Sequence, residues 1–440
     1  MAGRRVVITA VGAVSPLGLT SGQMWEGLLQ GRCGIGRIRA FDPAKMPCQI
    51  AGEVPEYNIR DYVPKAYRKA AKLMCRDIEL SVIAADEAVR ASGLVTKAID
   101  PEHPTLPSER TGIDFASGII SCELPEIAPS VAVSAENGRF DMKKWGREGI
   151  PTVTPLWLLK YLPNMLACHI GIIHDIQGPS NTITCGEVSS HIAISEGAEM
   201  IQRGHADIVL AGGGEAKVNP LLMVRQCLLK RSTFSGNHNP QAACRPFDAK
   251  ADGSVFGEGA GVLILEDLDF AKKRGAAILA EYAGGASSAA DTDDYIHLKN
   301  GGGLEIAVRQ ALEEARVRPE ELDLIIPHGT AVPSDDRIEA DVLQNVLGSA
   351  VSRVPVWPLK GQLSHAGSAA GALDLAAAVL AIRNQTIGAA FNLETPLDGC
   401  RLLFPKKAAA HPVRTVLCCG YSFGGQTAAV VLKRYEEKSE

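Results

Sequence analysis

Aromatic residues and long apolar runs are scarce in this sequence of 440 residues. Phe, Trp and Tyr together make up 5%, whereas glycine is plentiful at 44 residues, so we expect helices packed closely on sheets and no large β-sandwich. No apolar stretch reaches the roughly 18 residues that a membrane-spanning helix requires. We therefore expect no membrane partner.

Paired cysteines are also lacking. The 11 cysteines are scattered, odd in number and without a C-x-x-C pair, which argues against a zinc site and against a disulfide framework. The start, MAGRRVVITAVGAVSPLG, has a short β-branched run interrupted by Gly12 and Pro16, which favours a first buried strand over an export signal. These features predict a cytoplasmic protein with reduced thiols and no bound metal.

Neither sign of charge dominates the chain. The formal net charge is −5, and acidic and basic residues are mixed, so no basic stripe points to nucleic acid as a partner. A content of 46% hydrophobic and 22% charged residues is typical of an ordinary globular protein. The length accommodates two units of roughly 200 residues or one large duplicated α/β architecture.

Short β-branched runs alternate with alanine-rich helical patterns, which predicts an α/β protein layered around central sheets. The predicted strands are VVITAV, DIVLAGG, AGVLILE, LDLIIPHG and TAAVVLKR, and the predicted helices include SHIAISEGAEMIQRG, GLEIAVRQALEEARV and AAGALDLAAAVLAIRNQ. We place an N-terminal half at residues 1–265 and a similar C-terminal half at residues 266–440. The less periodic stretch from Gly112 to Thr154 is predicted to be a surface excursion that covers the site or contacts another subunit.

Four elements in loops that follow predicted strands carry residues suited to catalysis. The segment GPSNTITCGEVSSHIAISEGAEM is predicted to form a strand, a tight turn and a helix, and the start of a helix favours an anion. Further on, His328 follows LDLIIP, Lys360 and His365 lie in VWPLKGQLSHAG, and Phe423 lies in the glycine-rich turn YSFGGQ. One histidine alone is more often structural than catalytic, but four such elements together indicate a site.

In this order the segments resemble the β-ketoacyl-acyl-carrier-protein synthases, with the ketoacyl synthase II type as the best match. The resemblance covers nearly the whole chain and includes VVITAVGAVSPLG, WEGLLQGRCGI, NPQAACRPFDAKADGSVFGEGAGVLILED and the final SFGG turn. It implies the five-layer αβαβα thiolase fold with two similar halves, and an obligate dimer. It also implies no bound cofactor and a malonyl donor delivered by acyl carrier protein on a phosphopantetheine arm.

The resemblance assigns roles to individual residues. In the family, a cysteine at the turn is acylated, and two histidines help to decarboxylate the malonyl thioester; His328 and His365 fall on these histidine positions. Lys360 falls on the lysine that supports the histidines, and Asp374 replaces its usual carboxylate partner with a side chain one methylene shorter. Phe423 falls on the gating phenylalanine, whose backbone N–H contributes to the oxyanion hole.

The implied substrate-binding residues depart from the family pattern at two positions. Of the two threonines that bind the pantetheine arm, Thr330 keeps the first and Val332 replaces the second, so weaker pantetheine binding is expected. Ser422 replaces the glycine that normally precedes the gating phenylalanine, and Gly424 completes the turn. The serine is expected to stiffen the gate.

The position of the nucleophilic cysteine holds Glu187. An ungapped count forward from Gly178 and Pro179, and backward from Gly204, reaches Glu187, whereas Cys185 would need compensating gaps on both sides. A carboxylate does not support the thioester chemistry of the cysteine, so ordinary condensation is not expected. At a helix start beside two imidazoles, Glu187 is expected to be ionised and to raise the pKa of both histidines.

Three functions remain open from the sequence. The first is decarboxylation of malonyl-acyl carrier protein without condensation. The second is a subunit similar to a chain-length factor, paired as a heterodimer with a ketosynthase that has an intact cysteine; the alternative assembly is a homodimer. The third is a different reaction on a carrier-bound acyl group, with Glu187 as general base. In each case we expect Glu187, His328, His365 and Phe423 to meet in one pocket, and the strand ending LAGG to lie at a two-fold interface.

Overall fold

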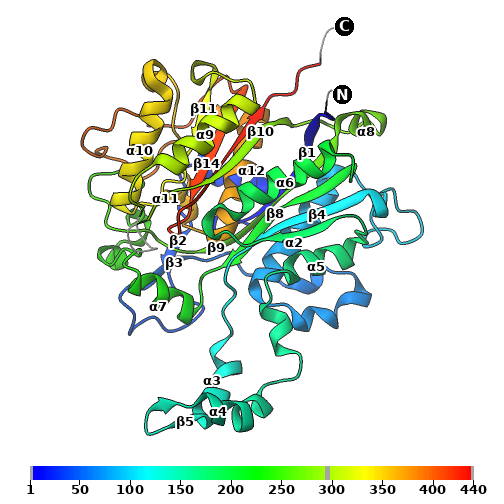
Figure 1. The fold of residues 1–440 in the computed structure, drawn as a ribbon, viewed down its shortest axis with the longest axis vertical. Coiled ribbons are helices and arrows are strands. Elements are labelled where there is room, and N and C mark those ends of the chain that lie inside the picture. The colour runs from blue at the N-terminus through cyan, green and yellow to red at the C-terminus, as the bar shows by residue number, and fades with distance from the viewer. Residues whose placement is uncertain (1–2, 293–297, 438–440) are drawn as a thin grey trace.

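The computed structural model describes residues 3–292 and 298–437, in which nine strands form one mixed sheet (Figure 1). Across the sheet the strands follow the order β11-β14-β15-β10-β1-β9-β8-β4-β7. Their bounds are β1 (Val6–Val14), β4 (Thr111–Ser117), β7 (Ser180–Ile183), β8 (Ile208–Ala216), β9 (Glu258–Asp267), β10 (Ala280–Ala289), β11 (Leu324–Ile326), β14 (Thr415–Tyr421) and β15 (Gln426–Lys433). All five strands predicted from the sequence are present.

Six longer helices turn this sheet into five layers. The first sheet layer comprises β1, β9, β8, β4 and β7, and the second comprises β10, β15, β14 and β11. The antiparallel pair β1–β10 joins the two layers, and α6 and α12 pack between them. Helices α2 and α5 cover the outer face of the first sheet layer, and α9 and α10 cover that of the second. Their bounds are α2 (Arg76–Ser92), α5 (Met165–His174), α6 (Ser189–Gln202), α9 (Gly302–Glu314), α10 (Pro333–Leu347) and α12 (Ala370–Asn384). The predicted αβαβα arrangement is confirmed.

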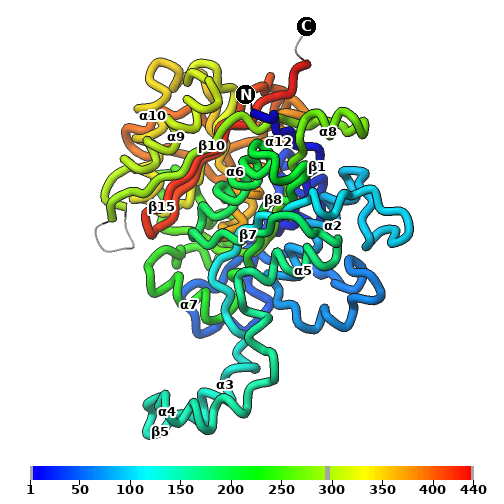
Figure 2. The backbone as a smooth tube through the Cα atoms, turned by 45° about the vertical axis from the view of Figure 1, so that its right-hand side comes forward, coloured from blue at the N-terminus to red at the C-terminus, as the bar shows by residue number. Residues whose placement is uncertain are grey.

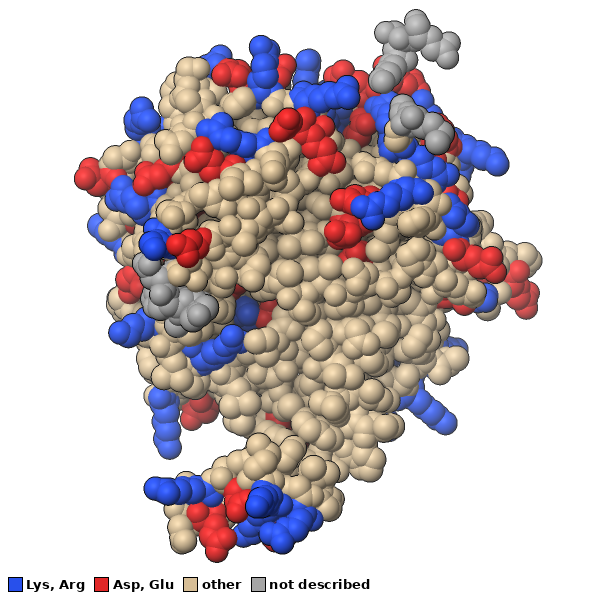
Figure 3. Space-filling view, viewed as in Figure 1, with Lys and Arg blue, Asp and Glu red and all other residues tan. Residues whose placement is uncertain are grey.

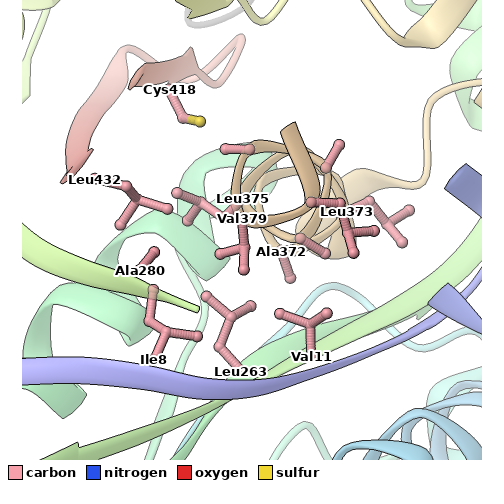
Figure 4. Packing of buried hydrophobic residues seen from close by; sticks show 14 of the residues in the cluster. Ile8, Val11, Leu263, Ala280, Ala372, Leu373, Leu375, Val379, Cys418 and Leu432 are labelled. Carbon is pink, nitrogen blue, oxygen red and sulfur yellow. The ribbon is translucent and has the colours of Figure 1, made fainter. Parts of the chain in front are cut away.

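Helix α12 is buried almost along its whole length because both sheet layers pack on it. Figure 4 shows Ala372, Leu375 and Val379 of this helix pointing toward the strands that carry Ile8 and Leu263. Small residues permit the close approach. At Gly261 of β9, an added Cβ would come within 2.8 Å of the Ala372 carbonyl carbon. The alanine-rich sequence is therefore explained by the space between the two sheet layers.

Shorter elements complete the described chain. These are α1 (Ser21–Leu29), α3 (Leu124–Val133), α4 (Met142–Lys144), α7 (Pro220–Leu228), α8 (Leu268–Lys273), α11 (Lys360–Leu363), β2 (Ile35–Arg37), β3 (Ile50–Gly52), β5 (Ala135–Glu136), β6 (Arg139–Phe140), β12 (Thr386–Ile387) and β13 (Ala409–Ala410). The predicted division at 265/266 falls inside β9 and stays a prediction. No helix among the described residues is long and apolar enough to cross a membrane.

The predicted excursion from Gly112 to Thr154 is partly wrong. Residues 112–117 belong to β4, which is buried between β8 and β7, so the excursion begins only at Gly118. Residues 118–164, here called the arm, carry α3, α4, β5 and β6 away from the body (Figure 2). Several apolar side chains of the arm are exposed, among them Met142 at 67% and Leu156 at 63%.

The prediction that the LAGG strand continues the sheet into a partner chain at a two-fold interface is also wrong. This strand is β8, and both of its edges are already paired, with β9 on one side and β4 on the other. The strand at this end of the sheet is β7, which pairs with β4 alone among the described strands.

Charged side chains gather in the upper part of the face in Figure 3 and at the tip of the arm, whereas the middle of that face has few.

Candidate active site

The turn that holds Glu187 connects the edge strand β7 to the central helix α6. Gly186 has φ of 63°, and a Cβ there would come within 3.0 Å of the Ser422 Cβ, so glycine suits both the backbone and the space. The 3-10 turn Gly186–Val188 runs directly into α6. The Ser189 hydroxyl donates to the Gly186 carbonyl at 2.6 Å and accepts from the Cys185 N–H at 2.8 Å. Glu187 therefore lies at a helix start, as predicted.

The environment of Glu187 raises the pKa of its carboxyl group. Its side chain is buried, and burial raises the pKa of Glu187 although the charges of Lys217 and Arg231 act in the opposite direction. Among the described residues, Oε2 has no hydrogen-bond partner. The expectation that the helix start and the imidazoles hold this carboxylate ionised is wrong in direction, because desolvation outweighs the nearby positive charges.

The two predicted histidines meet in the interior. His328 follows β11 and His365 follows α11, and their rings lie 5.1 Å apart at 89°. Burial, followed by the charge of Lys360, lowers the pKa of both histidines well below 6.5, so both imidazoles are neutral at ordinary pH. This contradicts the expected rise of their pKa beside Glu187.

Hydrogen bonding orients His365 and leaves several imidazole nitrogens available. The Gly367 N–H donates to His365 Nδ1 at 3.1 Å, so the ring proton of a neutral His365 lies on Nε2. Within the described part of the chain, Nε2 of His365 and both ring nitrogens of His328 lack a partner. Buried nitrogens of this kind cost free energy unless a ligand or water binds them. The pair is thus arranged to receive a polar group.

Lys360 and Asp374 form the ion pair that the sequence predicts. The distance from Nζ to Oδ2 is 3.2 Å, and the two side chains are 2% and 3% exposed. Burial raises the pKa of Asp374 to about 6, although Lys360 acts in the opposite direction. The charge of Lys360 in turn helps to keep both nearby imidazoles neutral.

A cavity of about 490 Å³ opens onto Glu187 but not onto the histidines. Its wall includes four of the predicted site residues, Glu187, Ser422, Phe423 and Gly424. Three of the other residues, Ile119, Ile120 and Tyr161, come from the arm, which explains why the cavity has an apolar side. His328 and His365 are not among the lining residues, so the predicted meeting of all four residues in one pocket is only partly correct.

The two positions assigned to the pantetheine arm are turned inward. The Thr330 hydroxyl donates to Asp336 Oδ1 at 3.2 Å and accepts from the Val332 N–H at 3.1 Å. Thr330 is completely buried and Val332 is 7% exposed, and neither lines the cavity. Their role in substrate binding stays a prediction.

Two buried ion pairs beside Glu187 were missed in the sequence. Arg231 Nη2 lies 2.7 Å from Asp335 Oδ2, with side chains 3% and 2% exposed. Lys217 pairs with Glu215 on the cavity wall. The only sequence signals are charged residues flanking apolar stretches, and such residues are usually on the surface. The Arg231 guanidinium also lies 5.4 Å from the centroid of the Phe423 ring.

Comparison with known proteins gives matches over nearly the entire chain. Residues 3–271 match the family model of the β-ketoacyl synthase N-terminal domain, and residues 279–394 match that of the C-terminal domain. A protein of Streptomyces halstedii named polyketide β-ketoacyl synthase 1 is 32% identical, with 99% of each chain covered. The 3-oxoacyl-[acyl-carrier-protein] synthase 2 of Synechocystis is 30% identical, with 98% of this chain and 99% of that protein covered.

The solved structures agree with these relatives. The ishigamide ketosynthase/chain length factor superposes with a TM-score of 0.83 at 28% identity, covering 99% of this chain and 100% of that chain. This similarity and the layer order confirm the predicted thiolase-type fold.

Proposed function

Since this chain belongs to the β-ketoacyl synthase family, we propose that it binds a malonyl or acyl group carried by acyl carrier protein and does not condense two such groups. The phosphopantetheine arm of the carrier would deliver the group, so no separate cofactor is needed. Glu187 at the start of α6 supports the non-condensing role, because a buried carboxyl group is a poor replacement for a thiolate nucleophile.

The leading proposal is decarboxylation of the malonyl thioester. The bond between the α-carbon and the carboxylate breaks, CO₂ leaves, and the electron pair forms an enolate on the thioester carbonyl. His328 and His365 would donate hydrogen bonds to the enolate oxygen, and protonation of the α-carbon then gives an acetyl thioester. Neutral imidazoles suit this role because each still has a ring N–H to donate.

The observation that carries this proposal is the buried histidine pair. Its rings are 5.1 Å apart, and three of the four ring nitrogens have no partner among the described residues. The raised pKa of Glu187 weakens an objection, because it lowers the cost of protonating this carboxyl group, and protonation removes its repulsion of the malonyl carboxylate. Lys360 and Asp374 also support the proposal, because a histidine pair that only filled space would not need a buried ion pair beside it.

The proposal is tested by incubation with malonyl-acyl carrier protein, followed by intact-mass analysis of the carrier. Loss of CO₂ from the carrier-bound group is expected with the native protein and should be lost in His328→Ala and His365→Ala. Unchanged malonyl carrier after prolonged incubation with folded native protein would refute decarboxylation.

A second function, that of a subunit similar to a chain-length factor, is supported by other observations. Thr330 and Val332 are turned away from the cavity, which is unfavourable for a pantetheine arm that has to reach the histidines. A known ketosynthase/chain length factor has the same fold at 28% identity. Co-purification of a cysteine-containing ketosynthase as a stoichiometric heterodimer would favour this function, and a homodimer active on malonyl carrier would contradict it.

A third function uses Glu187 as a general base on a carrier-bound acyl group. Two features favour it: Glu187 lines the cavity, and burial raises its pKa, which makes its carboxylate a stronger base. Acyl-carrier turnover that is abolished in Glu187→Gln but retained in His328→Ala would support this function over decarboxylation.

A further inference from the structure

Arg231 is a buried cation near the site with unused donors. Its side chain is 3% exposed, and its Nη2 donates to Asp335 Oδ2 at 2.7 Å. Nε and Nη1 have no partner among the described residues. A guanidinium has five N–H donors, and leaving them unbonded in the interior costs free energy. A buried guanidinium with free donors is therefore suited to bind an anionic group.

The position of Arg231 connects the cavity with the histidine pair. Its guanidinium lies over the Phe423 ring, at 5.4 Å from the centroid, and Phe423 lines the cavity. The charge of Arg231 is also close enough to affect Glu187 and both histidines, because it lowers the pKa of all three. Phe423 is therefore the residue that contacts both Arg231 and the cavity.

The other two buried cations near Glu187 and the histidines already have matching anions. Lys217 is paired with Glu215, and Lys360 is paired with Asp374. Glu215 also accepts a hydrogen bond from the Ser368 N–H at 2.6 Å, which fixes the orientation of its carboxylate. Of the buried cations around Glu187, Arg231 is therefore the one with donors to spare for an incoming anion.

We propose that Arg231 binds the free carboxylate of a carboxyacyl thioester, such as a malonyl group, whose thioester carbonyl lies at the histidine pair. This rests on the proposed function in assuming a carrier-bound acyl ligand. Guanidinium groups bind carboxylates through charge-assisted hydrogen bonds, which are stronger than bonds between neutral groups. The site then selects acyl groups that end in a carboxylate over neutral groups of the same shape.

The inference is tested by calorimetric binding of two pantetheine amides, malonyl and acetoacetyl. These probes have the same shape, but the first ends in a carboxylate and the second in a methyl ketone, and the amide resists decarboxylation. The native protein should bind the malonyl probe at least about tenfold more tightly, equivalent to about 1.4 kcal/mol. Equal affinity for the two probes in the native protein would by itself overturn the inference.

Variants locate the preference. Arg231→Met should bind both probes equally, but it leaves Asp335 buried without its partner and can destabilise the fold. Arg231→Met/Asp335→Leu removes both charges and should also bind the probes equally. Arg203→Met is the control, because Arg203 pairs with Glu199 at the end of α6 and does not line the cavity. It should keep the preference, and a preference that survives in the double variant would contradict the inference.

The outcome is distinguishable from failure of the proposed function. Binding selectivity for the malonyl amide with no release of CO₂ from malonyl-acyl carrier protein would refute decarboxylation and leave the Arg231 site intact. Release of CO₂ with no selectivity between the two amides would support decarboxylation and refute the Arg231 site. Glu187→Gln leaves Arg231 in place, so the preference should persist there.

Discussion

Asp374→Ala should destabilise the protein by about 3–5 kcal/mol at neutral pH, because it leaves the Lys360 ammonium buried without its counter-charge. The two side chains are 2% and 3% exposed and 3.2 Å apart, so neither water nor salt can replace the lost carboxylate. The double variant Lys360→Met/Asp374→Leu removes both charges and keeps most of the volume. It should recover most of this loss.

The pKa of Asp374 indicates why the double variant is expected to regain the stability that Asp374→Ala loses. Burial raises it from 3.8 to about 6, so ionising this carboxyl group in the native state at neutral pH costs about 3 kcal/mol relative to the unfolded chain. The favourable contribution of the protonated group is complete below pH 3.8 and is lost as the pH rises through 6. Relative to the native protein, the double variant should therefore gain stability between pH 4 and pH 7.

The assay is urea unfolding followed by circular dichroism, and Glu305→Ala is a suitable control. Glu305 pairs with Arg309 at 2.7 Å on α9, where the two side chains are 33% and 52% exposed. Partly exposed pairs of this type contribute about 0.5 kcal/mol. If Asp374→Ala were no more destabilising than Glu305→Ala, the reasoning about the buried ion pair would be refuted.

Three further predictions concern the nucleophile turn, pH and assembly. Cerulenin-type reagents should leave the turn at Glu187 unmodified by mass spectrometry, and Glu187→Cys should restore labelling and partial condensation; labelling of Cys185 with condensation in the native protein would contradict the assignment. Burial raises the pKa of Glu339 from 4.5 to about 8, so the unfolding free energy should fall as the pH rises through 8. In Glu339→Gln this fall should be smaller, and a pH profile identical to that of the native protein would contradict the prediction. The open edge of β7 and the apolar arm predict a dimer with an interface of at least roughly 2,000 Å²; sedimentation as a monomer at micromolar concentration would exclude it.

The sequence alone predicted the local elements and the family. Its β-branched runs and alanine-rich stretches match β1, β8, β9, β11 and β15 with α6, α9 and α12, because backbone preference and apolar periodicity act over a few residues. The turn position of Glu187 and the Lys360–Asp374 pair were also found from motif spacing. Motifs of this kind keep their spacing because the strand ends that carry them meet at one site.

Only the tertiary structure determined how these elements and charges meet. The LAGG strand became an interior strand because β4 and β9, far apart in sequence, pair with its two edges. Burial shifts the pKa of Glu187 opposite to the expected direction, since desolvation depends on the whole surrounding interior and not on neighbouring residues in the chain. The partner of Arg231 is Asp335, which is 104 residues further along the chain. No local pattern encodes such a contact, because chain folding alone brings the two side chains into one dry interior.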